Sequence, residues 1–362
     1  MIRVAFLVNE FPPGPGGIGA HAYALASYFT DKGAGVRVLT ARRVLCNSYS
    51  YDRELPFNVA RYSTNTGFVL KLLVNIVFLW RSRRWATHVI LSGTSQLLLA
   101  PIITLFSRAK ILCVIHGHEP LMVRGAMFWW LRKAINACNH VVAVSEFSKK
   151  MAVQGGFSGS IEVIPNGIHL GVQEIPERSV VSSPLKLITV GSVTPRKGQL
   201  NVIRALPQIN ARVGSVEYHV VGIPEMADSL MELANTLGVS DSLIIHGAVS
   251  DEERDKLLSD SHIFLLLSEN LSNGDVEGFG IAVLEANYFG LPAIGSIGTG
   301  VEQAIQNGET GFLVDAGNGD QIATAVERII NDYTTFSKQS ITWARDHDWK
   351  KIGEQYWKLM VA

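Results

Sequence analysis

Residues 2–40 read IRVAFLVNEFPPGPGGIGAHAYALASYFTDKGAGVRVLT, a pattern of strand, loop, helix and second strand. The β-branched run Ile2–Val8 predicts a buried parallel strand, and the glycine- and proline-rich stretch Pro12–Gly19 predicts a loop. Apolar residues then recur at helical spacing along His21–Tyr28, two glycines end this helix, and Val36–Thr40 predicts the next strand. The opening stretch is therefore a βαβ unit.

The same order of elements recurs about half a chain later. Leu185–Val190 predicts a strand, Gly191–Gly198 a loop, Gln199–Ile209 a helix that ends near Pro207, and Glu217–Val221 the next strand. Two such starts in 362 residues predict two doubly wound domains of roughly 150 residues each.

We therefore predict an α/β protein in which two Rossmann-like domains face each other across a cleft. Residues 1–170 form the first domain and 171–342 form the second, with the boundary in a linker-like stretch, Ile164–Pro184. Residues 343–362 form a Trp-rich helix that packs back on the first domain.

Charge and cysteine content narrow the class of protein. The chain has 32 basic and 32 acidic residues, so nothing supports a nucleic-acid binder. Cys46, Cys113 and Cys138 are odd in number and widely spaced, which predicts thiols in a reducing compartment, and no Cys/His cluster has zinc-ligand spacing. The N-terminus lacks the features of a signal peptide, so we expect a cytoplasmic protein.

The first loop formally matches a dinucleotide fingerprint, because Gly14–Gly19 fits G-x-G-x-x-G between a strand and a helix. Residues 9–13 separate it from the strand, however, and no acidic residue ends the second strand. Arg42 or Arg43 would suit the extra phosphate of NADP, so an NADP-dependent oxidoreductase stays an alternative. The loop is either a plain turn or a ligand-facing loop, and its N–H groups suit a phosphate or a sugar hydroxyl.

A second constellation lies in the second half of the chain. His262–Ser268 predicts a strand, a polar loop follows, and a helix begins near Ile281. The glycines before that helix allow close backbone approach to a ligand, and the first N–H groups of the helix present positive charge to a phosphate. Glu277 precedes the helix and Glu285 lies inside it, so both carboxylates are placed to reach one ligand.

Two further loops follow predicted strands. Thr194–Gly198 carries Arg196 and Lys197 beside a helix start, which favours a diphosphate clamp at the carboxyl end of the sheet. His116-Gly117-His118-Glu119 follows the strand Ile111–Ile115. Its first histidine is a candidate ligand-binding group, a hydrogen-bonded structural residue, or part of a metal pair that lacks a further ligand.

Taken in order along the chain, these motifs resemble those of glycosyltransferase family 4, which has the GT-B fold. The matching motifs are Gly16-Gly17-Ile18-Gly19-Ala20-His21, Val144-Ser145-Glu146-Phe147-Ser148, Ile164-Pro165-Asn166-Gly167, Glu277-Gly-Phe-Gly-Ile-Ala-Val-Leu-Glu285 (the E-x7-E signature), Gly290-Leu-Pro292 and Gly308-Glu-Thr-Gly311-Phe-Leu-Val. The resemblance covers nearly the whole chain.

The resemblance implies a retaining transferase that uses a nucleoside-diphosphate sugar and needs no metal or other cofactor. Glu285 would bind the ribose hydroxyls, Glu277 the donor sugar, and Lys197 the diphosphate. His116 would lie beside the reacting end of the sugar, and Gly17 near the donor phosphate. The other residues implied at the donor are Gly16, Ser192, Arg196, Phe279, Gly280, Ile281 and Leu284.

One position departs from the family pattern. The family often has Gly-Arg where this chain has Gly191-Ser192, and that arginine joins the lysine at the diphosphate. Arg196 is the candidate replacement. Besides the oxidoreductase, a nucleotide-sugar epimerase or hydrolase on the same fold and a non-catalytic sugar-binding module are the alternatives.

The acceptor side offers one signal, the apolar run Phe68–Trp80 with its basic flank Arg81, Arg83 and Arg84. This run is either an amphipathic helix on a membrane surface or a buried helix with a solvated basic end. We predict transfer of a hexose from a UDP- or GDP-sugar to a glycan or lipid-linked acceptor, in cell-surface polysaccharide or glycolipid synthesis. Membrane contact through 68–85 would place the protein at the inner face of the cell membrane.

Overall fold

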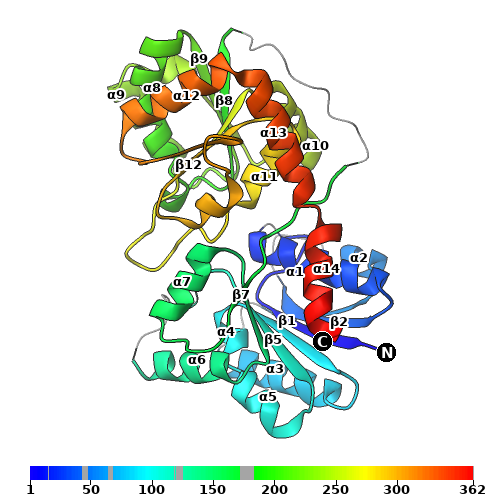
Figure 1. The fold of residues 1–362 in the computed structure, drawn as a ribbon. Coiled ribbons are helices and arrows are strands. Elements are labelled where there is room, and N and C mark those ends of the chain that lie inside the picture. The colour runs from blue at the N-terminus through cyan, green and yellow to red at the C-terminus, as the bar shows by residue number, and fades with distance from the viewer. Residues whose placement is uncertain are drawn as a thin grey trace. The chain divides into compact units, whose positions relative to one another are not determined.

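The computed structural model describes residues 1–14, 16–42, 48–63, 68–117, 119, 125–171 and 183–361. It divides the chain into two compact units (Figure 1). Unit 1 comprises Met1–Gly167 and Trp349–Ala362, and unit 2 comprises Ile168–Asp348. Arg43, Cys46, His118 and part of the expected linker, 172–182, lie outside the described residues.

Unit 1 is built on a parallel sheet with the strand order β3-β2-β1-β4-β5-β6-β7. Its strands are β1 Arg3–Val8, β2 Gly35–Arg42, β3 Asn58–Ser63, β4 His88–Ser92, β5 Lys110–Ile115, β6 His140–Ala143 and β7 Glu162–Val163. Its helices are α1 Gly17–Asp31, α2 Ser48–Glu54, α3 Phe68–Ser82, α4 Thr94–Leu97, α5 Ala100–Phe106, α6 Ala126–Asn136, α7 Glu146–Gln154 and α14 Trp349–Val361. The central strands are apolar on both faces, as in sheets covered by helices on each side.

Unit 2 repeats this arrangement, with the strand order β10-β9-β8-β11-β12-β13. Its strands are β8 Leu185–Val190, β9 Val216–Val221, β10 Leu243–Gly247, β11 Ile263–Leu266, β12 Ala293–Ser296 and β13 Gly311–Val314. Its helices are α8 Gln199–Val213, α9 Ala227–Thr236, α10 Asp251–Asp260, α11 Ile281–Tyr288, α12 Gly319–Asn331 and α13 Tyr333–Asp346. All hydrogen-bonded neighbours among these strands are parallel, so the prediction of two Rossmann-like domains is confirmed.

One helix boundary was predicted wrongly. Helix α8 does not end near Pro207 but continues to Val213, with Gly214 at φ +87° after it. Pro207 lacks the N–H that would bond one turn back, which costs the helix one hydrogen bond. The burial of Leu206 and Ile209 on both sides of the proline offsets this loss, because α8 packs closely on α12.

The end of the chain is also different from the prediction of one helix starting at residue 343. Helix α13 ends at Asp346 in unit 2, and α14 begins at Trp349 in unit 1. The indole N–H of Trp343 donates to the carbonyl of Ala304 in unit 2. The centre of the Trp349 ring, in contrast, lies 5.3 Å from the centre of the His21 ring in unit 1. The helical pattern therefore breaks at His347, whose carbonyl accepts from the N–H of Ile168 at 2.9 Å.

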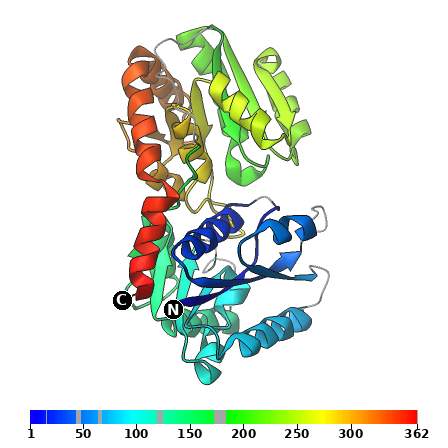
Figure 2. The same cartoon turned by 90° about the vertical axis from the view of Figure 1, so that its right-hand side faces the viewer.

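Helix α14 lies beside α1 in both views (Figures 1 and 2). The hydroxyl of the fully buried Tyr356 is 3.0 Å from His21 Nε2, and burial lowers the pKa of His21 to about 3. A Cβ at Gly353 would lie 2.5 Å from the Tyr28 ring, so this glycine lets the two helices meet. The Tyr28 hydroxyl also donates to Glu354 at 2.6 Å. The last helix is thus an integral part of unit 1.

We expect Tyr356→Ala to lower the free energy of unfolding of unit 1 by roughly 3–5 kcal/mol, because it leaves a large cavity between α1 and α14. Tyr356→Phe removes only the bond to His21 and should cost about 1 kcal/mol. Urea denaturation followed by tryptophan fluorescence measures both. Val361→Ala, at a residue 56% exposed on the same helix, is the control, and an equal loss there would contradict the packing argument.

Candidate functional site

In unit 2 the strand order reverses direction between β8 and β11, and the loops that follow these two strands meet. Ligands of open α/β sheets bind at the carboxyl ends of the strands at such a switch point. The N–H of Glu269, after β11, donates to the carbonyl of Arg196, after β8, at 2.9 Å. The Asn201 amide then donates to the Glu269 carboxylate at 2.6 Å. The two loops expected to share one edge of the sheet are therefore joined.

A cluster of charged side chains lies where these loops meet. Lys197 Nζ is 2.8 Å from Glu277 Oε2, and Arg196 Nη1 donates to the same oxygen. Arg196 Nε is 2.9 Å from the carboxylate of Asp275, a residue that the sequence did not single out. Burial raises the pKa of Glu277, but the two cations outweigh this effect and hold its pKa below the usual value. Glu277 is therefore ionised at neutral pH.

Gly198 allows the two loops to approach. Its φ is +71°, and a Cβ there would lie 1.7 Å from the carbonyl oxygen of Leu267. Gly191 has φ +147°, and a Cβ on it would meet the Lys197 side chain at 3.3 Å. The carbonyl of Ser192 accepts from the Gln199 amide at 3.2 Å. Because these backbone contacts hold the loop after β8, its two cations stay at the switch point.

Backbone contacts also fix the position of the first turn of α11. Gly280 has φ +88° and directly precedes Ile281, the first residue of α11. The N–H of Gly300 donates to the Glu277 carbonyl at 2.8 Å, and Phe279 is almost completely buried. The first N–H groups of a helix have no partner within it, so this turn is a suitable anion site. Leu284 is fully buried, so its side chain belongs to the core.

Glu285 lies further along α11 and is half-buried. Burial raises its pKa, and the positive charge of Arg254 is the largest effect in the opposite direction. Arg254 is on α10 and pairs with Asp251 at 2.8 Å and with Asp255 at 2.7 Å. Its place near Glu285 was not predicted, because the sequence of α10 resembles that of an ordinary charged surface helix.

His116 of unit 1 directly follows β5 and is buried. Its Nε2 is 2.9 Å from the Ser92 hydroxyl, and its ring meets that of His21 edge-on at 5.4 Å. The carboxylate of the buried Glu119 accepts hydrogen bonds from the backbone N–H groups of His116 and Gly117, each at 2.9 Å. These bonds stabilise the turn after β5. Within the described part of the chain, no group of three or more His, Cys, Asp or Glu is arranged to hold a metal.

The glycine loop of unit 1 begins α1, with Gly16 at φ +147° before Gly17. A Cβ on Gly16 would lie 2.2 Å from a carboxylate oxygen of Glu10. The sequence analysis did not predict that Glu10 approaches this glycine. Gly19 also approaches the N atom of Phe11, since a Cβ would lie 3.1 Å from it. Arg42 is exposed at the end of β2.

Two family models match consecutive parts of the chain. The model described as "Glycosyltransferase Family 4" matches residues 15–172, and the model described as "Glycosyl transferases group 1" matches residues 173–352. The chain belongs to glycosyltransferase family 4. The family resemblance predicted from the sequence is confirmed, and so is the GT-B fold class.

Individual proteins similar to this glycosyltransferase span nearly its whole length. The GDP-mannose-dependent alpha-(1-6)-phosphatidylinositol monomannoside mannosyltransferase of Mycobacterium tuberculosis is 27% identical, over 92% of this chain and 90% of the relative. A GDP-mannose-dependent monoacylated alpha-(1-6)-phosphatidylinositol monomannoside mannosyltransferase of Corynebacterium glutamicum is 24% identical, over 91% and 89%. The structure of Anabaena HepE in complex with UDP shares the fold, with a TM-score of 0.82 at 17% identity over 99% and 100% of the chains.

We expect Gly198→Ala to destabilise unit 2 of this glycosyltransferase clearly more than Gly238→Ala. Both glycines have a left-handed φ, +71° and +68°, so each alanine costs roughly 1–2 kcal/mol for its backbone conformation. Only at Gly198 does the new Cβ meet backbone, since nothing lies within 4 Å at Gly238. Urea denaturation compares the two variants, and equal losses of stability would contradict the close approach of the loops.

Proposed function

We propose that this glycosyltransferase moves a hexose from a UDP- or GDP-sugar to a hydroxyl of a glycan or lipid-linked acceptor, in cell-surface polysaccharide or glycolipid synthesis. The observation that carries the proposal is the cluster of Arg196, Lys197 and Glu277 at the switch point of unit 2. The similar mannosyltransferases named for GDP-mannose and the similar HepE structure with UDP support both classes of nucleotide.

The charges of the cluster suggest how a donor binds. Two cations and two carboxylates, Asp275 and Glu277, balance each other in the structure. A diphosphate brings negative charge to Arg196 and Lys197 and competes with Glu277 for them. In the proposed complex the diphosphate takes the cations, and Glu277 turns to the sugar hydroxyls. Glu285 accepts hydrogen bonds from the ribose hydroxyls.

The proposed reaction breaks the bond between the anomeric carbon and the β-phosphate oxygen. Negative charge grows on the leaving diphosphate, where Arg196, Lys197 and the N-terminus of α11 stabilise it. One preorganised donor of this kind is typically worth about 3 kcal/mol. The positive charge comes from these groups, so the proposal needs no metal or other cofactor. Arg196 takes the place of the arginine that the family often has at the position of Ser192.

The acceptor hydroxyl attacks on the face from which the diphosphate leaves, and the leaving phosphate takes its proton. Configuration is then retained without a protein nucleophile, which a two-step retaining mechanism would require. The family resemblance assigns His116 to the reacting end of the sugar and Gly17 to the donor phosphate. Both assignments stay predictions.

The alternative functions differ in what they bind and consume. Membership of a glycosyltransferase family does not favour an NADP-dependent oxidoreductase, which would also leave Glu277 and Glu285 without a role. An epimerase or hydrolase would consume the donor in the absence of any acceptor. A sugar-binding module would consume no donor at all.

We expect one nucleoside diphosphate, UDP or GDP, to raise the thermal stability of the protein without added metal. At about 100 times its dissociation constant a ligand adds roughly 2.7 kcal/mol. Glu285→Ala and Lys197→Ala should abolish the shift, whereas Glu309→Ala, at an exposed position of the same unit, should preserve it. A shift with NADPH alone would overturn the proposal, and normal turnover of Glu277→Ala would remove that residue from the mechanism.

We further propose that α3 contacts the inner face of the cell membrane. Residues Leu70, Leu73, Val77 and Trp80 are each about half exposed and follow one another at helical spacing, while Leu79 of the same helix is buried. The Arg83 guanidinium lies 3.6 Å from the centre of the Trp80 ring, a combination suited to the membrane interface. Among the described helices, none is long and apolar enough to cross a membrane.

The double variant Leu73→Glu/Val77→Glu should bind anionic vesicles at least tenfold more weakly than the unaltered protein. Burying two half-exposed aliphatic side chains is worth roughly 2 kcal/mol. Co-sedimentation with vesicles that contain phosphatidylserine measures the loss. Ile223→Glu/Met231→Glu, at similarly exposed residues of unit 2, is the matched control. Failure of the unaltered protein to bind at any salt concentration would contradict membrane contact.

A further inference from the structure

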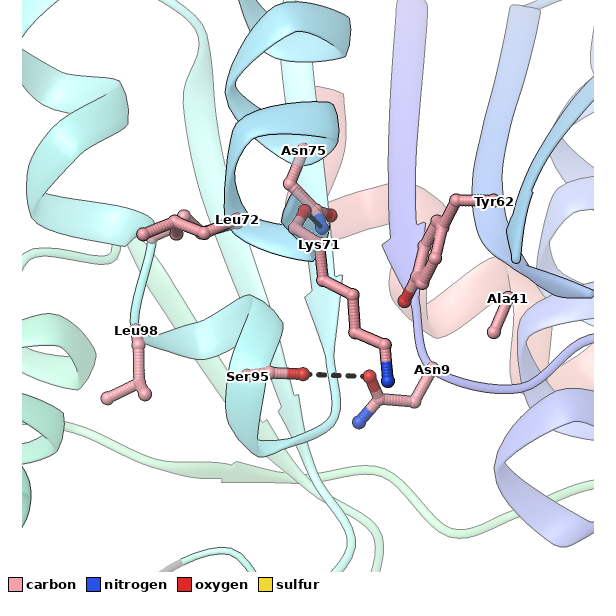
Figure 3. A pocket seen from close by; sticks show the side chains of 9 residues that line it. Asn9, Ala41, Tyr62, Lys71, Leu72, Asn75, Ser95 and Leu98 are labelled. Carbon is pink, nitrogen blue, oxygen red and sulfur yellow. Dashed lines mark hydrogen bonds between the residues drawn. The ribbon is translucent and has the colours of Figure 1, made fainter. Parts of the chain in front are cut away.

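A pocket of about 230 Å³ opens in unit 1, at the carboxyl ends of four neighbouring strands (Figure 3). Asn9 directly follows β1, Tyr62 is at the end of β3, and Ser95 follows β4. Strand order reverses between β1 and β4, so this pocket is at the switch point of unit 1. That is where open α/β sheets bind their ligands. None of its lining residues belongs to the glycine loop of α1 or to the donor residues of unit 2.

Helix α3 contributes a lysine to the wall of this pocket. The Lys71 side chain extends along the pocket toward Asn9 (Figure 3). Among the described residues, no carboxylate lines the pocket and none forms an ion pair with Lys71. This differs from the switch point of unit 2, where carboxylates neutralise both cations. The pocket therefore presents positive charge to a ligand.

Asn75, one turn further along α3, brings an unsatisfied group to the same pocket. It is 5% exposed, and its amide N–H donates to the Lys71 carbonyl at 2.7 Å, but its Oδ1 has no hydrogen-bond partner in the described structure. A buried acceptor without a partner costs roughly 1–3 kcal/mol. A ligand hydroxyl would remove that cost.

A third polar group of the pocket is the Tyr62 hydroxyl. The Gln96 amide donates to it at 3.4 Å, and burial raises the pKa of Tyr62, so the phenol keeps its proton and can donate to an anion. The pocket thus combines a cation and a hydroxyl donor with an acceptor. Its volume is smaller than the roughly 300–1,000 Å³ of pockets for drug-sized ligands, which fits one head group rather than an oligosaccharide.

We propose that this pocket binds a phosphorylated polyol, the head group of the acceptor, with Lys71 at its phosphate and Asn75 at one of its hydroxyls. The inference rests on the proposed transferase function, because it assigns the acceptor of that reaction. A phosphate and a hydroxyl on one small group match the lysine, the phenol and the unpaired amide oxygen together. Inorganic phosphate has no hydroxyl separate from its phosphate group, so it matches the lysine and the phenol but does not provide a second group for the amide oxygen.

Isothermal titration with myo-inositol 1-phosphate and with inorganic phosphate tests the proposal on the full chain. We expect Lys71→Met to weaken inositol phosphate binding at least tenfold, because it removes the only cation of the described pocket while keeping the length of the side chain. Lys110→Met, at the amino end of β5 and so at the opposite edge of the sheet, is the matched control and should bind like the unaltered protein. Asn75→Leu should weaken inositol phosphate but leave inorganic phosphate unchanged.

The nucleotide shift of each variant keeps this inference separate from the proposed function. If UDP or GDP stabilises the protein but Lys71→Met binds inositol phosphate as tightly as the unaltered protein, the pocket assignment is wrong and the transferase proposal stands. If no nucleotide binds, the proposed function fails. Equal affinity of the unaltered protein for inorganic phosphate and inositol phosphate would overturn the role of Asn75.

Vesicles distinguish the two sources of such a head group. We expect phosphatidylcholine vesicles that contain phosphatidylinositol to bind the unaltered protein more tightly than Lys71→Met, which supports a lipid-linked acceptor. Binding of soluble inositol phosphate without any effect of phosphatidylinositol supports a soluble acceptor in the same pocket. Vesicle binding that is equal for both proteins overturns the lipid-linked assignment.

Discussion

Gly198 and the carbonyl oxygen of Leu267 lie so close that no side chain fits between them, and the site in unit 2 depends on this contact. The contact places the loop after β8 on the loop after β11. Once the loops meet, Arg196 and Lys197 reach Glu277, and the Glu269 N–H reaches the backbone of Arg196. The charged cluster is therefore a consequence of backbone packing at the point where the strand order reverses.

The two units use the same strand order with different electrostatics. In unit 2, Glu277 and Asp275 neutralise the two cations, so the proposed diphosphate would compete with Glu277 for them. In unit 1, the described pocket at the corresponding switch point has Lys71 and no carboxylate. A ligand there meets positive charge directly. The two units thus differ in the charge that they present at corresponding switch points.

Helix α3 has two roles in unit 1. Its inner face carries Lys71 and Asn75 to the pocket, while Leu73 and Val77 leave an apolar stripe exposed. A helix that is apolar nearly all round is usually buried on every side. The structure shows that this run packs on the core through residues such as Leu79 and also leaves apolar side chains exposed, while contact with a membrane stays a prediction.

The sequence alone determined the two βαβ units, the family and the loops that carry Arg196, Lys197 and Glu277, because strand periodicity, glycines and motif order are local signals. Pro207 was misleading, since the burial of Leu206 and Ile209 outweighs one missing hydrogen bond. Asp275 pairs with Arg196, Arg254 acts on Glu285, and the pocket around Lys71 is lined by several strands and helices, so each of these contacts joins segments far apart in the chain. Only the folded sheets bring such segments together, so these contacts were decided by the tertiary structure.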